Sequence, residues 1–235
     1  MVVVNRREFR IGLVMVICFF VILFVMFSPL FGGKNAFEAA DDFFNSIAKG
    51  STYYMADLAK EAEKRRGRVV EVTIKLGDPK AASSAARMLK AAGALVEETG
   101  PQLRAAGDLA RITAAAIQDS EAMFKNSGQE VAARYAVSEK EALYLWWTAF
   151  REMEKDLKRQ RKFEEAAWLS TVSKKALEVG YNFYGIQAKS ASATAGGLAF
   201  SLIFYVIYTL WWGYAILFLC EGFGLQMKPG GKKEV

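Results

Sequence analysis

The sequence predicts an α+β protein, predominantly helical, in which two transmembrane helices flank an extracytoplasmic domain. Two uncharged runs, residues 11–31 and 198–220, each reach the length of about 20 residues that a helix needs to cross a bilayer. Between the runs, apolar residues recur at intervals of three and four, as on one face of an amphipathic helix. Residues 70–76 instead alternate apolar and polar side chains, which predicts a strand.

The first uncharged run is expected to stay in the protein as a membrane anchor. A signal peptide has an apolar region of about 7–15 residues followed by a small-x-small cleavage site. Residues 11–31 form a longer run, and the bulky Leu30 and Phe31 stand where small residues would be needed. We therefore expect an uncleaved helix that follows a short tail, residues 1–10.

Basic residues outside the two runs predict the orientation, because lysine and arginine close to a span favour the cytoplasmic side. They precede the first run and follow the second: Arg6, Arg7, Arg10, Lys228, Lys232 and Lys233. Both tails, residues 1–10 and 221–235, are therefore expected in the cytoplasm. Residues 34–196 are expected in the periplasm or outside the cell, and the predicted location is the bacterial inner (plasma) membrane.

The domain is expected to begin with helix over residues 36–64. Phe37, Ala40 and Phe44 recur at helical spacing, and Asn35 suits the N-cap position. The basic run at residues 63–68 follows.

Residues 68–107 predict a small strand–helix–strand–strand unit. The alternating residues 70–76 give the first strand, and the pair Asp78-Pro79 suits the cap and first position of a helix. Beyond that helix, two short segments flank the turn at Gly100-Pro101, which predicts a hairpin.

An all-α helical bundle is the alternative. In that arrangement residues 81–124 form two long alanine-rich helices whose seam would hold five residues: Leu103, Ala106, Ala110, Ile117 and Phe124. Gly100-Pro101 and Gly107-Asp108 interrupt the sequence where both helices would need continuity, and this favours the small sheet.

Residues 108–189 are expected to be helical throughout. Ser138 and Glu141 form a capping box, and a heavy apolar face follows at strict helical spacing: Leu143, Trp146, Phe150, Met153 and Leu157. A last helix repeats the spacing from Leu169 to Ile186. It leads through a linker of small residues into the second uncharged run.

Two groups of aromatic residues are candidates for binding a partner. Trp147 lies off the apolar face of its helix, with Tyr144 nearby, and needs cover from another element, a partner or lipid headgroups. In the second run Ser201, Tyr205, Tyr208 and Trp212 share one face. Packing on the first run, with anchoring at the membrane interface, is the first interpretation of that face. A subunit contact is the second, and a quinone contact is the third.

The sequence predicts no catalytic residues, no metal and no cofactor. Histidine is absent, which removes histidine-ligated metals and histidine bases, and both cysteines, Cys18 and Cys220, lie in the uncharged runs. The basic runs at residues 63–68 and 157–162 suit anionic lipid headgroups or a solvated surface. Nucleic acid is not an expected partner of an extracytoplasmic domain.

Two functional hypotheses follow. The first is a non-enzymatic two-span membrane protein whose extracytoplasmic domain binds a partner protein, or a second copy, as an accessory or structural subunit of a membrane assembly. The second is a ligand sensor, since the order span, domain, span resembles bacterial chemoreceptors in topology. The short tail at residues 221–235 leaves no room for an output module, so a sensor would need a separate cytoplasmic partner.

Overall fold

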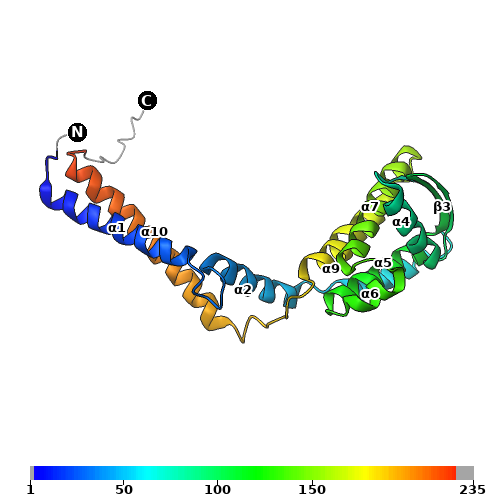
Figure 1. The fold of residues 1–235 in the computed structure, drawn as a ribbon, viewed down its shortest axis with the longest axis horizontal. Coiled ribbons are helices and arrows are strands. Elements are labelled where there is room, and N and C mark those ends of the chain that lie inside the picture. Colours follow the sequence, from blue (N-terminus) through cyan, green and yellow to red (C-terminus); the bar gives the residue numbers. More distant parts are fainter. Residues whose placement is uncertain (1–2, 226–235) are drawn as a thin grey trace, which may run out of the picture. The chain divides into compact units, whose positions relative to one another are not determined.

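The computed structural model describes residues 3–225. The structure is predominantly helical (69%). The chain divides into two compact units, one of Met1–Ile47 with Lys189–Val235 and the other of Ala48–Ala188. The helix α2 (Ala36–Ser51) begins in the first unit and ends in the second (Figure 1).

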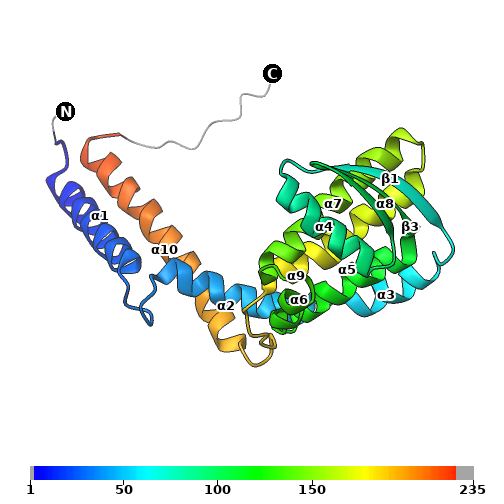
Figure 2. The ribbon, with the colours of Figure 1, turned by 45° about the vertical axis from the view of Figure 1, so that its right-hand side comes forward.

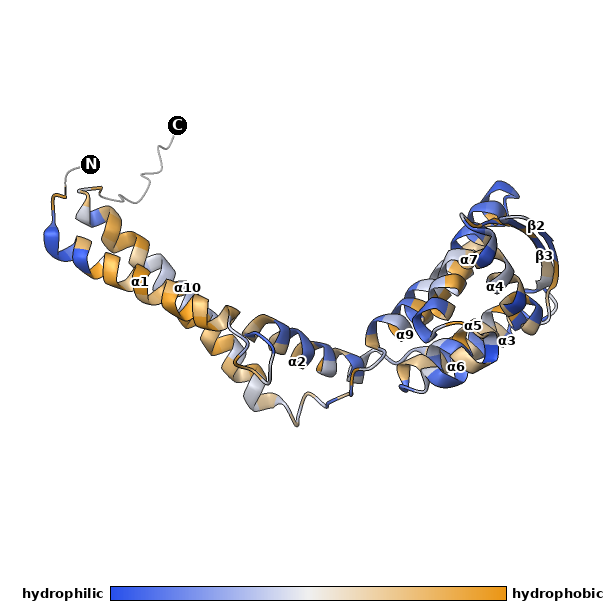
Figure 3. Ribbon diagram, viewed as in Figure 1, coloured by the Kyte–Doolittle hydropathy of each residue, from blue (hydrophilic) through white to orange (hydrophobic). Residues whose placement is uncertain are grey.

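The first unit is an antiparallel pair of helices, α1 (Arg6–Phe27) and α10 (Ala195–Gly222). The N–H groups of Val4 and Asn5 both donate to the carbonyl of Gly222, at 2.9 and 3.0 Å, so the start of α1 lies against the end of α10. Both helices are long and apolar enough to cross a membrane, and Figure 3 shows them coloured as hydrophobic along most of their length. Only 6% of the most apolar window of each helix is buried, so their apolar side chains are exposed.

Small residues set the distance between α1 and α10. A Cβ atom added at Gly12 would lie 2.7 Å from the backbone nitrogen of Leu219 and 3.1 Å from the carbonyl of Ala215. One added at Gly222 would lie 2.7 Å from Cα of Phe9. The two backbones therefore approach so closely that larger residues do not fit, as in many membrane helix pairs.

The second unit packs helices against one face of a small sheet (Figure 2). Its elements in chain order are α3 (Met55–Glu63), β1 (Val69–Lys75), α4 (Pro79–Ala91), β2 (Leu95–Thr99), β3 (Gln102–Asp108), α5 (Leu109–Phe124), α6 (Gly128–Tyr135), α7 (Glu139–Arg159), α8 (Phe163–Val172), a π-helical turn η1 (Ser173–Leu177) and α9 (Glu178–Phe183). The sheet is antiparallel in the order β1-β3-β2. The predicted small sheet is therefore confirmed, and the all-α alternative is wrong.

The sheet forms where the sequence predicts it because the turn residues favour the backbone conformations that its connections need. Gly100 has φ +58° and stands first in the two-residue loop between β2 and β3, where a hairpin turn needs positive φ. Val70, Val72 and Ile74 of β1 are buried, whereas Glu71 and Lys75, whose side chains point to the other face, are exposed. Asp78 caps α4 by accepting from the N–H of Ala81 at 3.0 Å, and Pro79 occupies the first turn.

The helices differ from the sequence pattern in three places. The expected helix at 36–64 is two helices, α2 and α3, separated at residues 52–54. The last helix contains the wider π-helical turn η1 and ends at Phe183, so Ile186 lies beyond it. In the first unit α1 ends at Phe27, because Pro29 disfavours helical backbone at the residue before it.

Candidate functional site

The helix α7 positions the aromatic residues that the sequence singles out. Its first turn is capped by Ser138, whose hydroxyl accepts from the N–H of Glu141 at 3.4 Å. The predicted apolar face is buried: Leu143, Trp146, Phe150, Met153 and Leu157 are each at most 1% exposed. Burial of this face fixes the rotation of α7 about its axis and so determines what its other side presents.

Tyr144, Trp147 and Arg151 form a stack on the other side of α7. The rings of Tyr144 and Trp147 are stacked, with centroids 6.2 Å apart, and the guanidinium of Arg151 lies 5.3 Å from the centroid of Trp147. The indole nitrogen of Trp147 donates to Oε1 of Glu178, on α9, at 3.2 Å. We call these four residues the aromatic face. It remains open to solvent, since Tyr144 is 57% exposed.

A second pair of residues extends the aromatic face along α9. Tyr181 lies one turn beyond Glu178 and is 38% exposed, and the ammonium of Lys140 lies 5.3 Å from its ring centroid. Lys140 lies one turn before Tyr144 on α7. Aromatic rings and cations therefore alternate over the paired surfaces of α7 and α9.

A buried carboxylate holds the helices beneath the aromatic face. Asp119 of α5 is fully buried, and its Oδ2 accepts from the indole of Trp146 and from the hydroxyl of Tyr135, both at 2.8 Å. Arg134 pairs with its other oxygen. Burial raises the pKa of the Asp119 carboxyl above its ordinary value of 3.8, while the bonds from Trp146 and Tyr135 act in the opposite direction. The network joins α5, α6 and α7, so its role is to hold Trp146 in place.

A buried lysine secures the end of α9. Lys49 is 4% exposed, and its ammonium donates to the carbonyls of Phe183 at 3.0 Å and Ile186 at 2.6 Å. It also donates to Oδ1 of Asn126 and lies 4.9 Å from the ring centroid of Phe124. Burial lowers the pKa of Lys49. A cation on the last carbonyls of a helix offsets their partial negative charge, and this anchors the helix that carries Glu178 and Tyr181.

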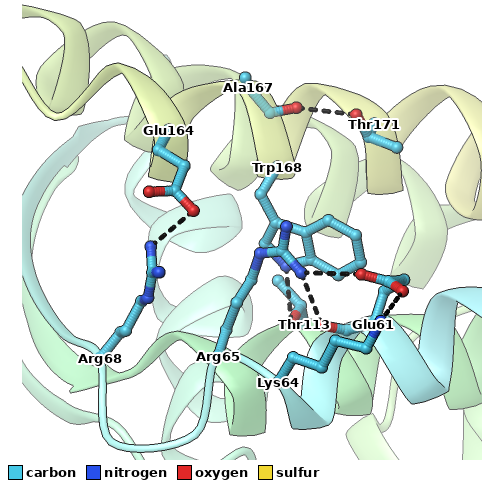
Figure 4. A network of polar contacts seen from close by, with 9 residues as sticks. All are labelled: Glu61, Lys64, Arg65, Arg68, Thr113, Glu164, Ala167, Trp168 and Thr171. Atoms are coloured by element: carbon cyan, nitrogen blue, oxygen red, sulfur yellow. Dashed lines mark hydrogen bonds and ion pairs between the residues drawn. The ribbon is translucent and has the colours of Figure 1, made fainter.

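The basic run at residues 63–68 does not present a continuous positive surface. Figure 4 shows Arg65 lying over the ring of Trp168, 4.1 Å from its centroid, and donating to the carbonyl of Glu61 at 2.6 Å. Arg68 pairs with Glu164 at 2.9 Å. Arg65 and Arg68, in the segment between α3 and β1, therefore contact residues of α8. Fewer positive charges of this run are then free to bind lipid headgroups.

The structure divides the four candidate residues of the second uncharged run. Tyr208 stacks on Phe19 with centroids 4.2 Å apart, and Trp212 lies 4.5 Å from the same ring, so both pack on α1. Tyr205 is 67% exposed, and the hydroxyl of Ser201 donates within its own helix. Trp211, which lies off the predicted face, donates to the carbonyl of Met15 at 3.1 Å.

Over the described residues 3–225, no group of three or more cysteine, aspartate or glutamate side chains is placed to hold a metal ion. Comparison of the chain with models of protein families, with curated proteins and with solved structures finds no match. The aromatic face is thus the candidate site, on geometry alone.

Proposed function

We propose that this chain is a non-enzymatic, two-span membrane protein whose domain between the spans binds a partner protein, as an accessory or structural subunit of a membrane assembly. The observation that carries the proposal is the aromatic face. Tryptophan, tyrosine and arginine are the residue types that contribute most to protein–protein binding energy, and here they stack on one another at the surface.

The preorganisation of the aromatic face supports a binding role. The indole of Trp147 is fixed by its bond to Glu178, and the ring of Tyr144 is fixed by stacking on Trp147. Side chains that are already ordered lose little conformational entropy when a partner binds, so more of the contact energy appears as affinity.

The helix pair supports the membrane part of the proposal. The two antiparallel helices expose large apolar side chains such as Phe24, at 75%, and Phe200, at 68%. Exposure of such side chains is unfavourable in water and favourable in lipid. Antiparallel packing brings the start of α1 and the end of α10 together, and the arginines in the first turns of α1 favour the cytoplasmic side for that end. The domain would then be periplasmic or extracellular in a bacterial inner membrane.

The topology is tested with reporter fusions after Gly128 and after the C-terminal Val235. We expect the two reporters on opposite sides of the membrane, with the one at Gly128 outside. Two cytoplasmic reporters would contradict the two-span arrangement.

The binding role is tested by affinity purification of the full chain in mild detergent. Trp147→Ala and Arg151→Ala are expected to deplete one or more co-purifying proteins. Phe163→Ala is the matched control, because Phe163 is also an exposed aromatic residue, at 62%, but lies on α8 outside the aromatic face. The same set of proteins with all three variants would contradict the role of the aromatic face.

A further inference from the structure

The two edges of the small sheet differ. Among the described residues, α7 and its C-cap cover the outer edge of β1. Asp156 of α7 accepts from the N–H of Thr73 at 3.0 Å, and Gln160, the C-cap, donates to the carbonyl of Glu71 at 2.8 Å. These two bonds also show which residues of β1 direct their backbone groups outward, namely Glu71 and Thr73.

The same alternation identifies the outward groups of β2. Residues of an antiparallel pair direct their backbone groups alternately toward and away from the partner strand. Thr99 and Gln102 close the hairpin, so Thr99, Glu97 and Leu95 bond to β3. The N–H and C=O groups of Val96 and Glu98 therefore point away from β3. Among residues 3–225 neither residue makes a backbone hydrogen bond beyond those of the sheet.

This edge presents two donors and two acceptors at the spacing that an added strand needs. We propose that the β2 edge binds an extended, basic segment of a partner protein by strand addition, independently of the aromatic face. The side chains of β2 support the choice of a basic segment. Glu97 and Leu95 lie on the open side of the sheet, Leu95 is 80% exposed, and Glu97 lies directly opposite Arg104 of β3 without forming a salt bridge to it among the described residues.

Glu98 contributes less charge to the edge than Glu97. Its carboxylate accepts from Lys90 at 2.7 Å and from Ser83 at 3.0 Å, both on α4, so the ammonium of Lys90 offsets its negative charge. Glu97 is therefore the residue that would select a lysine or arginine opposite it, since opposite charges on directly paired residues stabilise a sheet.

The carboxylate of Glu97 also disfavours binding of a second copy of this chain at the β2 edge. A symmetric antiparallel pair of β2 strands that uses both outward residues of each strand must pair Val96 with Glu98 of the other copy. The centre of that pairing places Glu97 opposite Glu97, and like charges directly opposite one another are destabilising. Edge charges are a common means of preventing such self-association.

The test measures binding of a labelled synthetic peptide to the full chain in a neutral detergent. The peptide alternates valine and lysine over about seven residues, the length of an ordinary strand, and a second peptide has glutamate in place of lysine. The lysine peptide is expected to bind and the glutamate peptide is not. Val96→Pro is expected to weaken binding about tenfold, because it removes an outward N–H and places a ring at the edge.

Val69→Pro is the matched control. Val69 is also exposed, at 67%, and points its N–H outward, but it lies on the β1 edge beside α7, so we expect no change in binding. Neither proline removes a bond of the sheet, and thermal unfolding followed by circular dichroism checks that both variants fold. Glu97→Lys leaves the backbone unchanged and is expected to shift the preference toward the glutamate peptide by about fivefold.

Three results would overturn the proposal. They are the absence of binding by the lysine peptide, equal binding of the two peptides, or binding that Val96→Pro and Glu97→Lys both leave unchanged. Sedimentation of the wild-type chain tests the other occupant: self-association that Val96→Pro abolishes would assign the edge to a second copy and contradict the proposed partner.

Discussion

In the helix pair of the first unit the buried residues are small, whereas in the second unit they are large. The one residue that α1 buries is Gly12, and α10 buries Ala215 and Gly222, while large side chains such as Phe20, Phe24, Phe200 and Leu202 are exposed. The second unit buries Trp146 and Phe150 and exposes its charges. This contrast is the one expected if the helix pair lies in lipid, as proposed, and the second unit lies in water.

The difference shows what holds each unit together. In water, burial of large apolar side chains is the main favourable contribution to folding. Between helices in lipid that contribution is lost, because lipid tails are as apolar as leucine, and close backbone packing replaces it. Truncation of a large buried side chain should therefore destabilise the second unit. Enlargement of a buried glycine should destabilise the helix pair of the first unit.

The largest expected effect is at Trp146. Trp146→Ala should lower the free energy of unfolding by about 3–5 kcal/mol, since it opens a cavity in the core. It also removes a donor from the buried carboxylate of Asp119. Denaturant unfolding of the full chain in mild detergent measures the change. Trp146→Phe keeps most of the volume and should cost less; equal losses in the two variants would show that the hydrogen bond, not the volume, dominates.

Gly12→Val tests the other half of the comparison. Its Cβ would collide with backbone atoms of Leu219 and Ala215, which cannot rotate away, and we expect a cost of about 1–3 kcal/mol to the helix pair. Gly213→Val is the control, because a Cβ atom at Gly213 meets no atom within 4 Å.

Cross-linking between introduced cysteines measures the Gly12 effect. Phe9 and Phe223 have ring centroids 5.2 Å apart, so Phe9→Cys and Phe223→Cys should be linked by a short thiol reagent when Cys18 and Cys220 are replaced by alanine. Gly12→Val should reduce the linked fraction and Gly213→Val should not. Equal linking in both would mean that small residues do not set the distance between α1 and α10.

Asp108 links stability to pH in the second unit. It caps α5 by accepting from the N–H of Ala110 at 2.8 Å, and it accepts from the N–H of Gly67 at 2.8 Å. Burial alone would raise the pKa of Asp108, but these backbone donors hold it below its ordinary value of 3.8. The ionised form is therefore favoured by folding, and its contribution is full above the unfolded pKa and is lost as the pH falls through the folded pKa.

Asp108→Ala should accordingly cost about 1–2 kcal/mol at neutral pH. The difference from wild type should shrink as the pH is lowered below 3.8. Urea unfolding at a series of pH values measures it. Asp57→Ala is the control, since Asp57 is exposed and pairs only loosely with Lys60 at 3.7 Å; a pH-independent loss at Asp108 would contradict the linkage.

Local patterns predict the fold well where the relevant contacts are local. The alternation in β1 and the Gly100-Pro101 turn are read directly from the sequence, and the register of Trp146 with Leu143 and Phe150 places it in the core. The rotation of α7 follows from that register, and so does the exposure of Tyr144.

The remaining features depend on residues that are distant in sequence. Asp119 is one of two acids in the alanine-rich helix α5, and nothing nearby in sequence indicates that Trp146 and Tyr135 will donate to it. Tyr205, Tyr208 and Trp212 share one helical face in the sequence pattern. Tyr208 and Trp212 pack on Phe19 of the other helix and Tyr205 does not, and the spacing alone does not predict this difference. The residues that share one face of a helix can be predicted from their spacing, whereas the residues that pack against that face cannot.

The smallest effect on folding is expected at Trp147, the neighbour of Trp146 in sequence. Adjacent residues on a helix point about 100° apart, so the two indoles lie in different environments although their chemistry is the same. Trp147 packs in part against the core, keeps the rest of its ring exposed, and contacts Tyr144, Arg151 and Glu178. Trp147→Ala should therefore lower the free energy of unfolding by about 1 kcal/mol, the worth of such aromatic and cation–π contacts at exposed sites. Denaturant unfolding beside Trp146→Ala, with co-purification of the same variants, separates the two roles. A loss at Trp147 as large as that at Trp146 would place both indoles in the core and remove the argument for the aromatic face as a binding surface.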